Sequence, residues 1–185
     1  MISITKLILE ESGKHEYGAV ILFFKFPELQ KLQSKITKED IYTGDGGDRS
    51  YGLEDNPHVT LLYGLHEEVT LDQVKNIVDQ YTYTPLRLHT ASTFNNPLYD
   101  VLKFDVGYVV KGGAFLQKAN KALSKLPNTN SFPEYHPHAT MGYLKPNTGK
   151  KYVSLLKGKE YTVTPEYIIY STPEGIEHKI KINTK

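Results

Sequence analysis

The sequence predicts an α+β fold with two similar lobes. Strand-like segments are in the majority, and short helical segments are interspersed among them rather than gathered in one part of the chain. The two halves also follow the same order of elements: strands, a helix, a strand that opens with Pro-His-x-Thr, and a further helix. Because no low-complexity tract or Pro/Ser linker divides the chain, we expect residues 1–185 to form a single bilobal domain.

The N-terminal part of the chain is expected to contain two strands and a helix. Apolar and polar residues alternate over Ile2–Glu10, which predicts a strand. Tyr17–Phe26 is a nearly continuous apolar run suited to a buried strand. Pro27 can occupy the first turn of a helix. The apolar face of that helix would consist of Leu29, Leu32 and Ile36.

A long loop and the first Pro-His-x-Thr strand follow. The segment Thr43–Pro57 is rich in Gly and Asp, and its length is typical of functional loops such as a lid. His58–Tyr63 is expected to be a short strand. Thr70 then caps a helix that runs to about Tyr81, with Gln73 placed for a capping box.

The C-terminal part repeats these types of element. Strands are expected over Leu86–Thr90 and Tyr99–Val106, and a helix over Ala114–Leu126. The remaining elements are a strand over His138–Leu144, a short helix that begins near Thr148 and includes Val153–Leu156, and two strands, Tyr161–Ser171 and Ile176–Ile182, around a Thr-Pro-Glu-Gly turn.

Charge and composition limit the classes of ligand. The formal net charge is +1, and the arginines are at positions 49 and 87. Arginine is the side chain best matched to phosphate groups, and long nucleic acids usually bind to broad basic surfaces. We therefore expect a small phosphate-containing ligand rather than a long nucleic acid. The absence of cysteine excludes disulfides, thiolate zinc sites and cysteine nucleophiles.

The hydrophobic pattern of the sequence favours a soluble protein. The N-terminus lacks a basic segment followed by an apolar run, and no apolar stretch approaches the length needed to span a bilayer. We expect a soluble, cytoplasmic monomer that does not associate with membranes.

Two short sequences contain the residues that indicate chemistry. They read PHVTL at residues 57–61 and PHATM at residues 137–141, and Gly and Tyr follow each within four residues. Positions i and i+2 of a strand face the same side, so each His projects together with its Thr. If a pseudo-twofold axis relates the two lobes, two imidazoles and two hydroxyls converge on one cleft.

This arrangement is suited to cleavage of a phosphodiester without a metal. One of His58 and His138 can take a proton from the attacking oxygen while the other, protonated, donates a proton to the leaving oxygen. The hydroxyls of Thr60 and Thr140 can donate hydrogen bonds to the non-bridging oxygens, where negative charge grows in the transition state. These four residues are the predicted catalytic residues, and no cofactor is expected.

The paired motifs resemble those of the 2H phosphoesterase superfamily, which includes 2′-5′ RNA ligase-like enzymes and 2′,3′-cyclic nucleotide phosphodiesterases. The resemblance is carried mainly by residues 55–66 and 132–144. Within the superfamily, residues 14–18 (KHEYG), 54–66 (EDNPHVTLLYGLH) and 99–105 (YDVLKFD) are most similar to the phage anti-CBASS phosphodiesterases, which degrade cyclic oligonucleotide immune signals. The resemblance implies antiparallel sheets around a central cleft, with helices outside.

The resemblance also implies a substrate and further site residues. A Tyr near the N-terminus stacks on a base in that family, and Tyr17 is the matching residue. The family can place a Trp opposite this Tyr; the present chain has no Trp, and Phe94 is the substitute. An acidic residue of the late strands corresponds to Glu166. The implied substrate is a small cyclic di- or trinucleotide such as cGAMP, whose own 2′-hydroxyl is positioned to attack the 3′-5′ bond.

Other functions and sites stay open at this stage. One is a sibling enzyme that opens 2′,3′-cyclic phosphates or 2′-5′ linkages in RNA, although residues 142–144 (GYL) replace the Arg that usually follows the second motif there. Another is a non-catalytic protein that sequesters a nucleotide. A zinc site at His66 and His136, or a calcium site in the loop, lacks the spacing of a known metal motif. The candidate calcium ligands are Asp45, Asp48 and Asp55.

Overall fold

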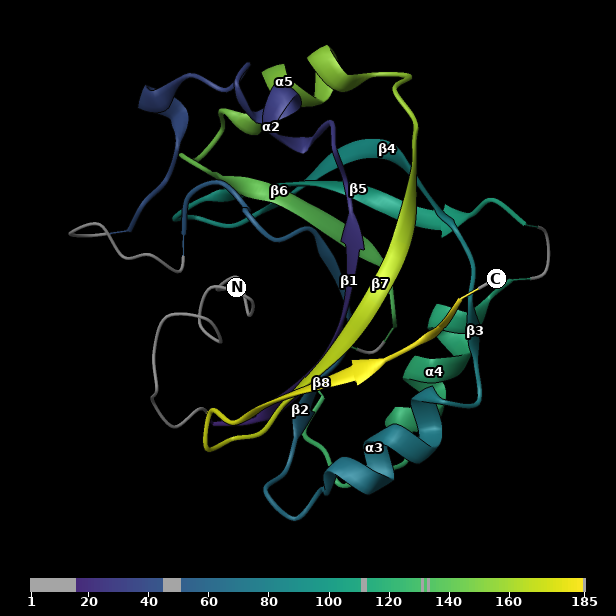
Figure 1. The fold of residues 1–185 in the computed structure, drawn as a ribbon. Coiled ribbons are helices and arrows are strands. Elements are labelled where there is room, and N and C mark those ends of the chain that lie inside the picture. Colours follow the sequence, from purple (N-terminus) through teal and green to yellow (C-terminus); the bar gives the residue numbers. More distant parts are fainter. Residues whose placement is uncertain (1–15, 45–50, 111–112, 131, 133, 185) are drawn as a thin grey trace.

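A mostly antiparallel sheet runs through the molecule in the computed structural model (Figure 1). The structure describes residues 16–44, 51–110, 113–130, 132 and 134–184. The hydrogen-bonded strand order is β2 (His58–Leu65), β1 (Gly18–Lys25), β7 (Tyr161–Ser171), β4 (Leu86–Asn95), β5 (Asp100–Tyr108) and β6 (His138–Leu144), and β8 (Glu177–Lys181) also pairs with β7. A separate parallel pair consists of β3 (Thr82–Tyr83) and β9 (Asn183–Thr184).

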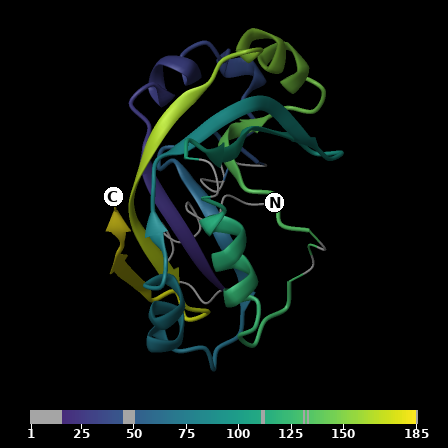
Figure 2. The same cartoon turned by 90° about the vertical axis from the view of Figure 1, so that its right-hand side faces the viewer.

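The helices lie at two ends of this sheet (Figures 1 and 2). At one end, α2 (Leu29–Gln33) packs against β6, and α5 (Gly149–Leu156) packs against β4 and β5. At the other end, α3 (Leu71–Val78) packs against α4 (Phe115–Leu123), which contacts β2. A short 3₁₀ turn, Lys38–Asp40, follows α2. None of the helices in the described ranges is long and apolar enough to cross a membrane.

Strand β7 belongs to both lobes of the molecule. Its residues 161–163 pair with β4, whereas residues 164–171 pair with β1. The first lobe therefore consists of β1, β2, β8 and residues 164–171 of β7. The second lobe consists of β4, β5, β6 and residues 161–163 of β7. The predicted α+β fold with two antiparallel lobes is confirmed.

The two lobes are interleaved rather than formed from successive halves of the chain. Helix α2 follows β1 of the first lobe but packs on β6 of the second, and α4 follows β5 of the second lobe but packs on β2 of the first. Both sets of elements contribute to one hydrophobic core. The repeated order of elements in the sequence did not reveal this exchange, because it depends on pairing between distant segments.

The segment that precedes each Pro-His-x-Thr strand lies along the edge of the other Pro-His-x-Thr strand. Residues 52–54, which precede β2, lie along β6: Tyr143 N–H donates to the Gly52 carbonyl at 2.8 Å, and Glu54 N–H donates to the Met141 carbonyl at 3.0 Å. Residues 127–129, which precede β6, lie along β2, where Thr129 N–H donates to the Gly64 carbonyl at 2.8 Å. We call these two pairings the reciprocal edge contacts.

Glycine is required where these edges approach most closely. A Cβ atom on Gly64, whose φ is +109°, would lie 2.4 Å from the Thr129 carbonyl oxygen. A Cβ atom on Gly142 would lie 3.1 Å from the Gly52 carbonyl oxygen. The first distance is too short for a side chain, and the second is tight enough that the neighbouring backbone would have to shift slightly, so both glycines ease the close approach.

The same irregularity follows the Thr of both motifs. Pairing with β1 passes from Thr60 directly to Leu62, which leaves Leu61 as an extra residue. Pairing with β5 passes from Thr140 directly to Gly142, which leaves Met141 as an extra residue. Such β-bulges twist a strand locally and are common beside active sites.

An amide side chain from the exchanged helix binds the carbonyl of each bulge. Asn120 of α4 donates from Nδ2 to the Leu61 carbonyl at 2.7 Å. Gln33 of α2 donates from Nε2 to the Met141 carbonyl at 3.0 Å and to the Glu54 carbonyl at 2.6 Å. The bulges and their amides are therefore related by the same pseudo-symmetry as the motifs.

Most of the expected elements are confirmed, with some changes of bounds. Strand β7 has the expected bounds, and Thr70 forms the expected capping box with Gln73 at the start of α3. Strand β4 continues past the expected end at Thr90 to Asn95. The expected end was too early because Thr90, with a φ of +48°, lies at a register shift that interrupts the alternating pattern of the sequence. The expected strand Ile2–Glu10 and residues 45–50 of the expected loop lie outside the described residues.

We expect Gln33→Ala to destabilise the fold, whereas Gln30→Ala on the exposed face of the same helix should be nearly neutral. The first substitution removes the side-chain donor of the Glu54 carbonyl and one of the two donors of the Met141 carbonyl, and a buried group left unsatisfied costs about 1–3 kcal/mol. Urea unfolding of both variants measures the difference. Equal stability of the two variants would show that the amide does not hold the edge contact.

Candidate active site

His58 and His138 begin β2 and β6, and each lies on the face opposite to the main core. The intervening residues Val59 and Ala139 are buried in that core, so alternation turns each His and its Thr to the other face. His58 pairs across the sheet with Phe23, and His138 pairs with Asp105. The predicted placement of both His-x-Thr pairs on one face of each strand agrees with this geometry.

Both imidazoles are held by the same backbone contact. Nδ1 of His58 lies 2.8 Å from the carbonyl oxygen of Asn56, and Nδ1 of His138 lies 2.9 Å from that of His136. A carbonyl oxygen can only accept, so Nδ1 carries the hydrogen in each ring. The lone pair of a neutral ring is therefore on Nε2.

The proline before each His explains this contact. Proline disfavours helical backbone in the preceding residue and keeps it extended, which fixes the direction of the Asn56 and His136 carbonyls. The prolines themselves are anchored, because Phe24 N–H donates to the Pro57 carbonyl at 3.2 Å and Val106 N–H donates to the Pro137 carbonyl at 3.0 Å.

The surroundings of His138 favour its neutral form. Burial lowers its pKa below the ordinary 6.5, and the positive charges of Lys103 and His58 lower it further. The hydrogen bond to the His136 carbonyl and the charge of Asp105 oppose this shift. Together these influences favour the neutral form of the His138 imidazole.

His58 has an anion rather than a cation beside it. Oε2 of Glu54 lies 4.0 Å from Nδ1 of His58, and the Glu54 side chain is fully buried. Oε1 of the same carboxylate accepts the backbone N–H of Asn56 at 3.1 Å. A protonated His58 would form an ion pair with Glu54. The arrangement therefore suits His58 as the proton donor and His138 as the proton acceptor.

The two threonines present their hydroxyls on the same face as the imidazoles. Thr60 and Thr140 are both half-buried. Within the described part of the chain neither hydroxyl has a hydrogen-bond partner, which leaves both able to donate to a ligand. The Thr60 backbone is held by Tyr135, whose hydroxyl donates to its carbonyl at 3.0 Å.

Phe94 lies beside the second motif, and not opposite Tyr17 as expected. Its ring is 39% exposed and meets the His138 imidazole edge-on, with 4.9 Å between ring centroids. Nζ of Lys103 lies 4.6 Å from the centre of the Phe94 ring. A base that stacked on Phe94 would lie next to the proposed proton acceptor.

Tyr17 does not lie near either motif. It precedes Gly18, which pairs with Leu65, whereas Phe23 pairs with His58 at the other end of β1. Six residues of strand separate these ends, a distance of about 20 Å. The expected stacking residue and the catalytic residues are thus not brought together.

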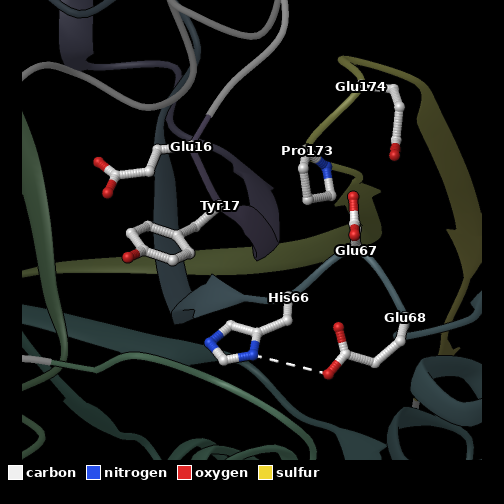
Figure 3. A pocket seen from close by; sticks show the side chains of 7 residues that line it. All are labelled: Glu16, Tyr17, His66, Glu67, Glu68, Pro173 and Glu174. Carbon is white, nitrogen blue, oxygen red and sulfur yellow. Dashed lines mark ion pairs between the residues drawn. The ribbon is translucent and has the colours of Figure 1, made fainter.

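Figure 3 shows Tyr17 in an open pocket of about 350 Å³. Its ring stacks on that of His66, with 6.0 Å between centroids. The rest of the lining is mainly acidic: Glu16, Glu67, Glu68, Glu174 and Pro173. Carboxylates at this density repel a phosphate group, so the pocket is poorly suited to a nucleotide.

Glu166 lies at the rim of the first lobe. Its Oε1 forms an ion pair with Nζ of Lys25 at 3.1 Å, and Lys25 is largely exposed. The next residue, Tyr167, stacks on Phe23 with 5.1 Å between centroids, and Phe23 contacts the His58 ring at 5.6 Å. Glu166 is therefore separated from His58 by a row of aromatic rings.

Two residues of this site were not identified from the sequence. Glu54 reads as part of a loop, and its contact with His58 follows from the reciprocal edge contacts. Lys103 reads as an ordinary strand lysine, yet alternation along β5 separates Lys103 and Asp105 from the buried Leu102 and Phe104. That alternation was a usable signal, because β5 pairs with the strand that contains His138.

The residues considered as metal ligands are dispersed. His66 lies in the Tyr17 pocket, and His136 forms an ion pair with Glu134 at 3.3 Å. Asp55 is exposed, and the other two loop aspartates lie outside the described residues. Among residues 16–44, 51–110, 113–130, 132 and 134–184, no group of three or more His, Cys, Asp or Glu is arranged to hold a metal ion.

Several known structures are similar to this chain. Usb1 of Kluyveromyces marxianus has a TM-score of 0.54 and 10% sequence identity, over 92% of this chain and 99% of that chain. A structure of the same protein with uridine monophosphate has a TM-score of 0.53 and 9% identity, over 89% and 97% of the two chains. The PDE domain of MHV ns2 has a TM-score of 0.47 and 15% identity, over 91% and 100%.

The likeness to Usb1 identifies the fold. At 10% identity this likeness shows that the present chain and Usb1 share a fold. No protein-family model matches the sequence, and no curated protein sequence is significantly similar to it.

We expect the His138 imidazole to titrate below pH 6.5, because burial and two nearby positive charges oppose its protonation. NMR of the imidazole protons, assigned with a His138→Ala variant, measures the midpoint. In His58→Ala one of the two charges is absent, so the midpoint should rise toward 6.5. A wild-type midpoint above 6.5 would contradict the role of His138 as a neutral proton acceptor.

Proposed function

We propose that this protein is a phosphodiesterase that uses His138 as the general base and His58 as the general acid. The observation that supports this most directly is the matched pair of Nδ1–carbonyl contacts, at 2.8 and 2.9 Å. These contacts occupy Nδ1 and leave Nε2 of both rings available for proton transfer. A protein that only bound a nucleotide would not need two imidazoles in the same tautomer on matched strands.

In the proposed reaction the attacking group is the 2′-hydroxyl of the substrate. Nε2 of His138 takes its proton while the 2′-oxygen forms a bond to phosphorus. The bond between phosphorus and the 5′-oxygen breaks, and protonated His58 donates its Nε2 proton to that oxygen. The products are a 2′,3′-cyclic phosphate and a free 5′-hydroxyl, and water can open the cyclic phosphate with the two roles reversed.

The threonines complete this mechanism. The hydroxyls of Thr60 and Thr140 would donate to the non-bridging phosphate oxygens as their negative charge grows. Because the acid, the base and the hydrogen-bond donors are all side chains of the chain itself, we propose that the reaction needs no metal.

For the substrate class we propose small cyclic oligonucleotides, as in phage counter-defence. This finer proposal is supported by the sequence resemblance in residues 54–66 and 99–105, and by a net charge of +1, which is low for a protein that binds a long nucleic acid. The exposed face of Phe94 offers a surface for one base beside His138.

A second candidate is a phosphodiesterase of linear RNA. The observation in its favour is the fold shared with Usb1, one structure of which contains uridine monophosphate. A substrate panel separates the two candidates: cyclic di- and trinucleotides, and linear oligoribonucleotides with a 3′-hydroxyl or a 2′,3′-cyclic phosphate. The products are resolved by mass.

We expect His58→Ala and His138→Ala each to lower kcat by roughly 10²–10⁴-fold, the usual contribution of general acid–base catalysis. His178→Ala, on β8, is the matched control and should keep wild-type activity. The double variant should lose little beyond the worse single variant, since the two residues act as one unit. Full activity in either single variant would refute the assignment.

Chelation is the control for the metal-free mechanism. Activity should survive excess EDTA, and loss of activity that zinc or manganese restores would favour a metalloenzyme instead.

We further expect a substrate with hydrogen in place of the scissile 2′-hydroxyl to bind but not to be cleaved. The nucleophile is then missing, whereas stacking and phosphate contacts remain. A time course on the ribo and 2′-deoxy forms of one cyclic dinucleotide tests this. Comparable turnover of both forms, or a product with a 5′-phosphate, would mean that water attacks directly.

A further inference from the structure

We propose that Lys103 binds the scissile phosphate, so that it adds a lasting positive charge beside the second His-x-Thr pair; this inference rests on the proposed phosphodiesterase function. Lys103 is the cross-strand partner of Thr140, and the next residue on its face, Asp105, is the partner of His138. Its ammonium therefore shares the face on which the second motif presents its imidazole and hydroxyl.

The pseudo-symmetry of the lobes shows that the fold itself does not require a lysine here. Thr60 in the first lobe has Ile21 as its cross-strand partner, in the position that Lys103 occupies beside Thr140. Ile21 is fully buried. An apolar residue thus satisfies the same position in one lobe, and a cation replaces it in the other.

Keeping this cation out of water is costly, which favours a functional reason for it. The Lys103 side chain is only 8% exposed. Its Nζ donates to Oγ of Ser92 at 2.8 Å and to Oδ1 of Asp105 at 2.5 Å. A buried ammonium needs such partners to offset its lost hydration. Ser92 and Asp105 hold the ammonium in place but accept only two of its three hydrogens.

Within the described ranges, one of the three ammonium hydrogens has no acceptor and is available for a ligand. Two are used by Ser92 and Asp105, and the Phe94 ring, 4.6 Å away, adds a cation–π contact. A phosphate next to Thr140 and His138 would meet this remaining N–H. A base stacked on Phe94 would then be attached to the phosphate that Lys103 binds.

The charge of Lys103 also acts on the neighbouring base. It lowers the pKa of His138, as does the charge of His58, against the opposing charge of Asp105. One cation would thus contact the phosphate and help to keep the proton acceptor neutral.

The test compares Lys103→Met with the wild type in two measurements. The first is kcat/KM for the substrate found in the panel. The second is the dissociation constant of inorganic phosphate, obtained from NMR shifts of the His138 imidazole at fixed pH. We expect kcat/KM to fall by roughly 10²–10³-fold, the usual effect of removing one donor to a developing oxyanion, and phosphate to bind about 10-fold more weakly or worse, as for lost charged hydrogen bonds.

Two further variants sharpen the comparison. Lys103→Arg keeps the charge and should bind phosphate more tightly than Lys103→Met. Lys75→Met, on α3, removes the same charge away from the cleft and should behave as the wild type. If Lys103→Met does not fold, Lys103→Gln takes its place, because Gln keeps an N–H donor for Ser92.

The outcomes separate this inference from the proposed function. Unchanged phosphate affinity in Lys103→Met overturns the inference, even if activity is lost, because the residue would then be structural. Undetectable phosphate binding by the wild type also overturns it. If no phosphodiester is cleaved by the wild type but phosphate affinity falls in Lys103→Met, the proposed function fails and the phosphate site stands.

Discussion

The two Pro-His-x-Thr strands are held together because the segment that precedes each of them forms backbone hydrogen bonds with the other. Residues 52–54 pair with β6 and residues 127–129 pair with β2, so neither motif can be positioned without the opposite lobe. The bulge carbonyls of Leu61 and Met141 are bound by amides from the exchanged helices. Backbone pairing of this kind is directional and cannot slip without leaving buried polar groups unsatisfied. The relative placement of His58 and His138 therefore depends on folding of the whole chain.

On this symmetric scaffold the chemistry is asymmetric. Equivalent positions next to the two motifs are occupied by Ile21 and Phe23 in the first lobe and by Lys103 and Asp105 in the second. His58 consequently has aromatic neighbours and the buried Glu54 carboxylate, whereas His138 has an ammonium close by. Two rings in matching backbone contacts thus have different charged neighbours, which would suit the different roles proposed for them.

Local pattern in the sequence was sufficient for most of the fold and for the four motif residues. The alternation of His, small residue and Thr predicted the shared face of each pair, and the Thr70–Gln73 spacing predicted the cap of α3. Local pattern was insufficient wherever a contact joins distant segments. The interleaving of α2 and α4 depends on such contacts, which no periodicity in the sequence predicts. Phe94 lies beside His138 because β4 pairs with β5 and β5 with β6, an order that the sequence left undetermined.

The charges around Tyr17 differ from those around the second motif, and this difference would orient a charged ligand. The pocket around Tyr17 is lined by four glutamates, whereas the second motif has a nearly buried ammonium beside it. Tyr17 lies beyond the end of the β1–β2 pairing that is remote from His58, whereas Lys103 lies in the second lobe, on the strand that pairs with β6. A small polyanion that entered between them would be repelled from the Tyr17 end and attracted toward Lys103 and His138. With a net charge of only +1, the chain would thus guide a phosphate by the local placement of a few charges rather than by a basic surface.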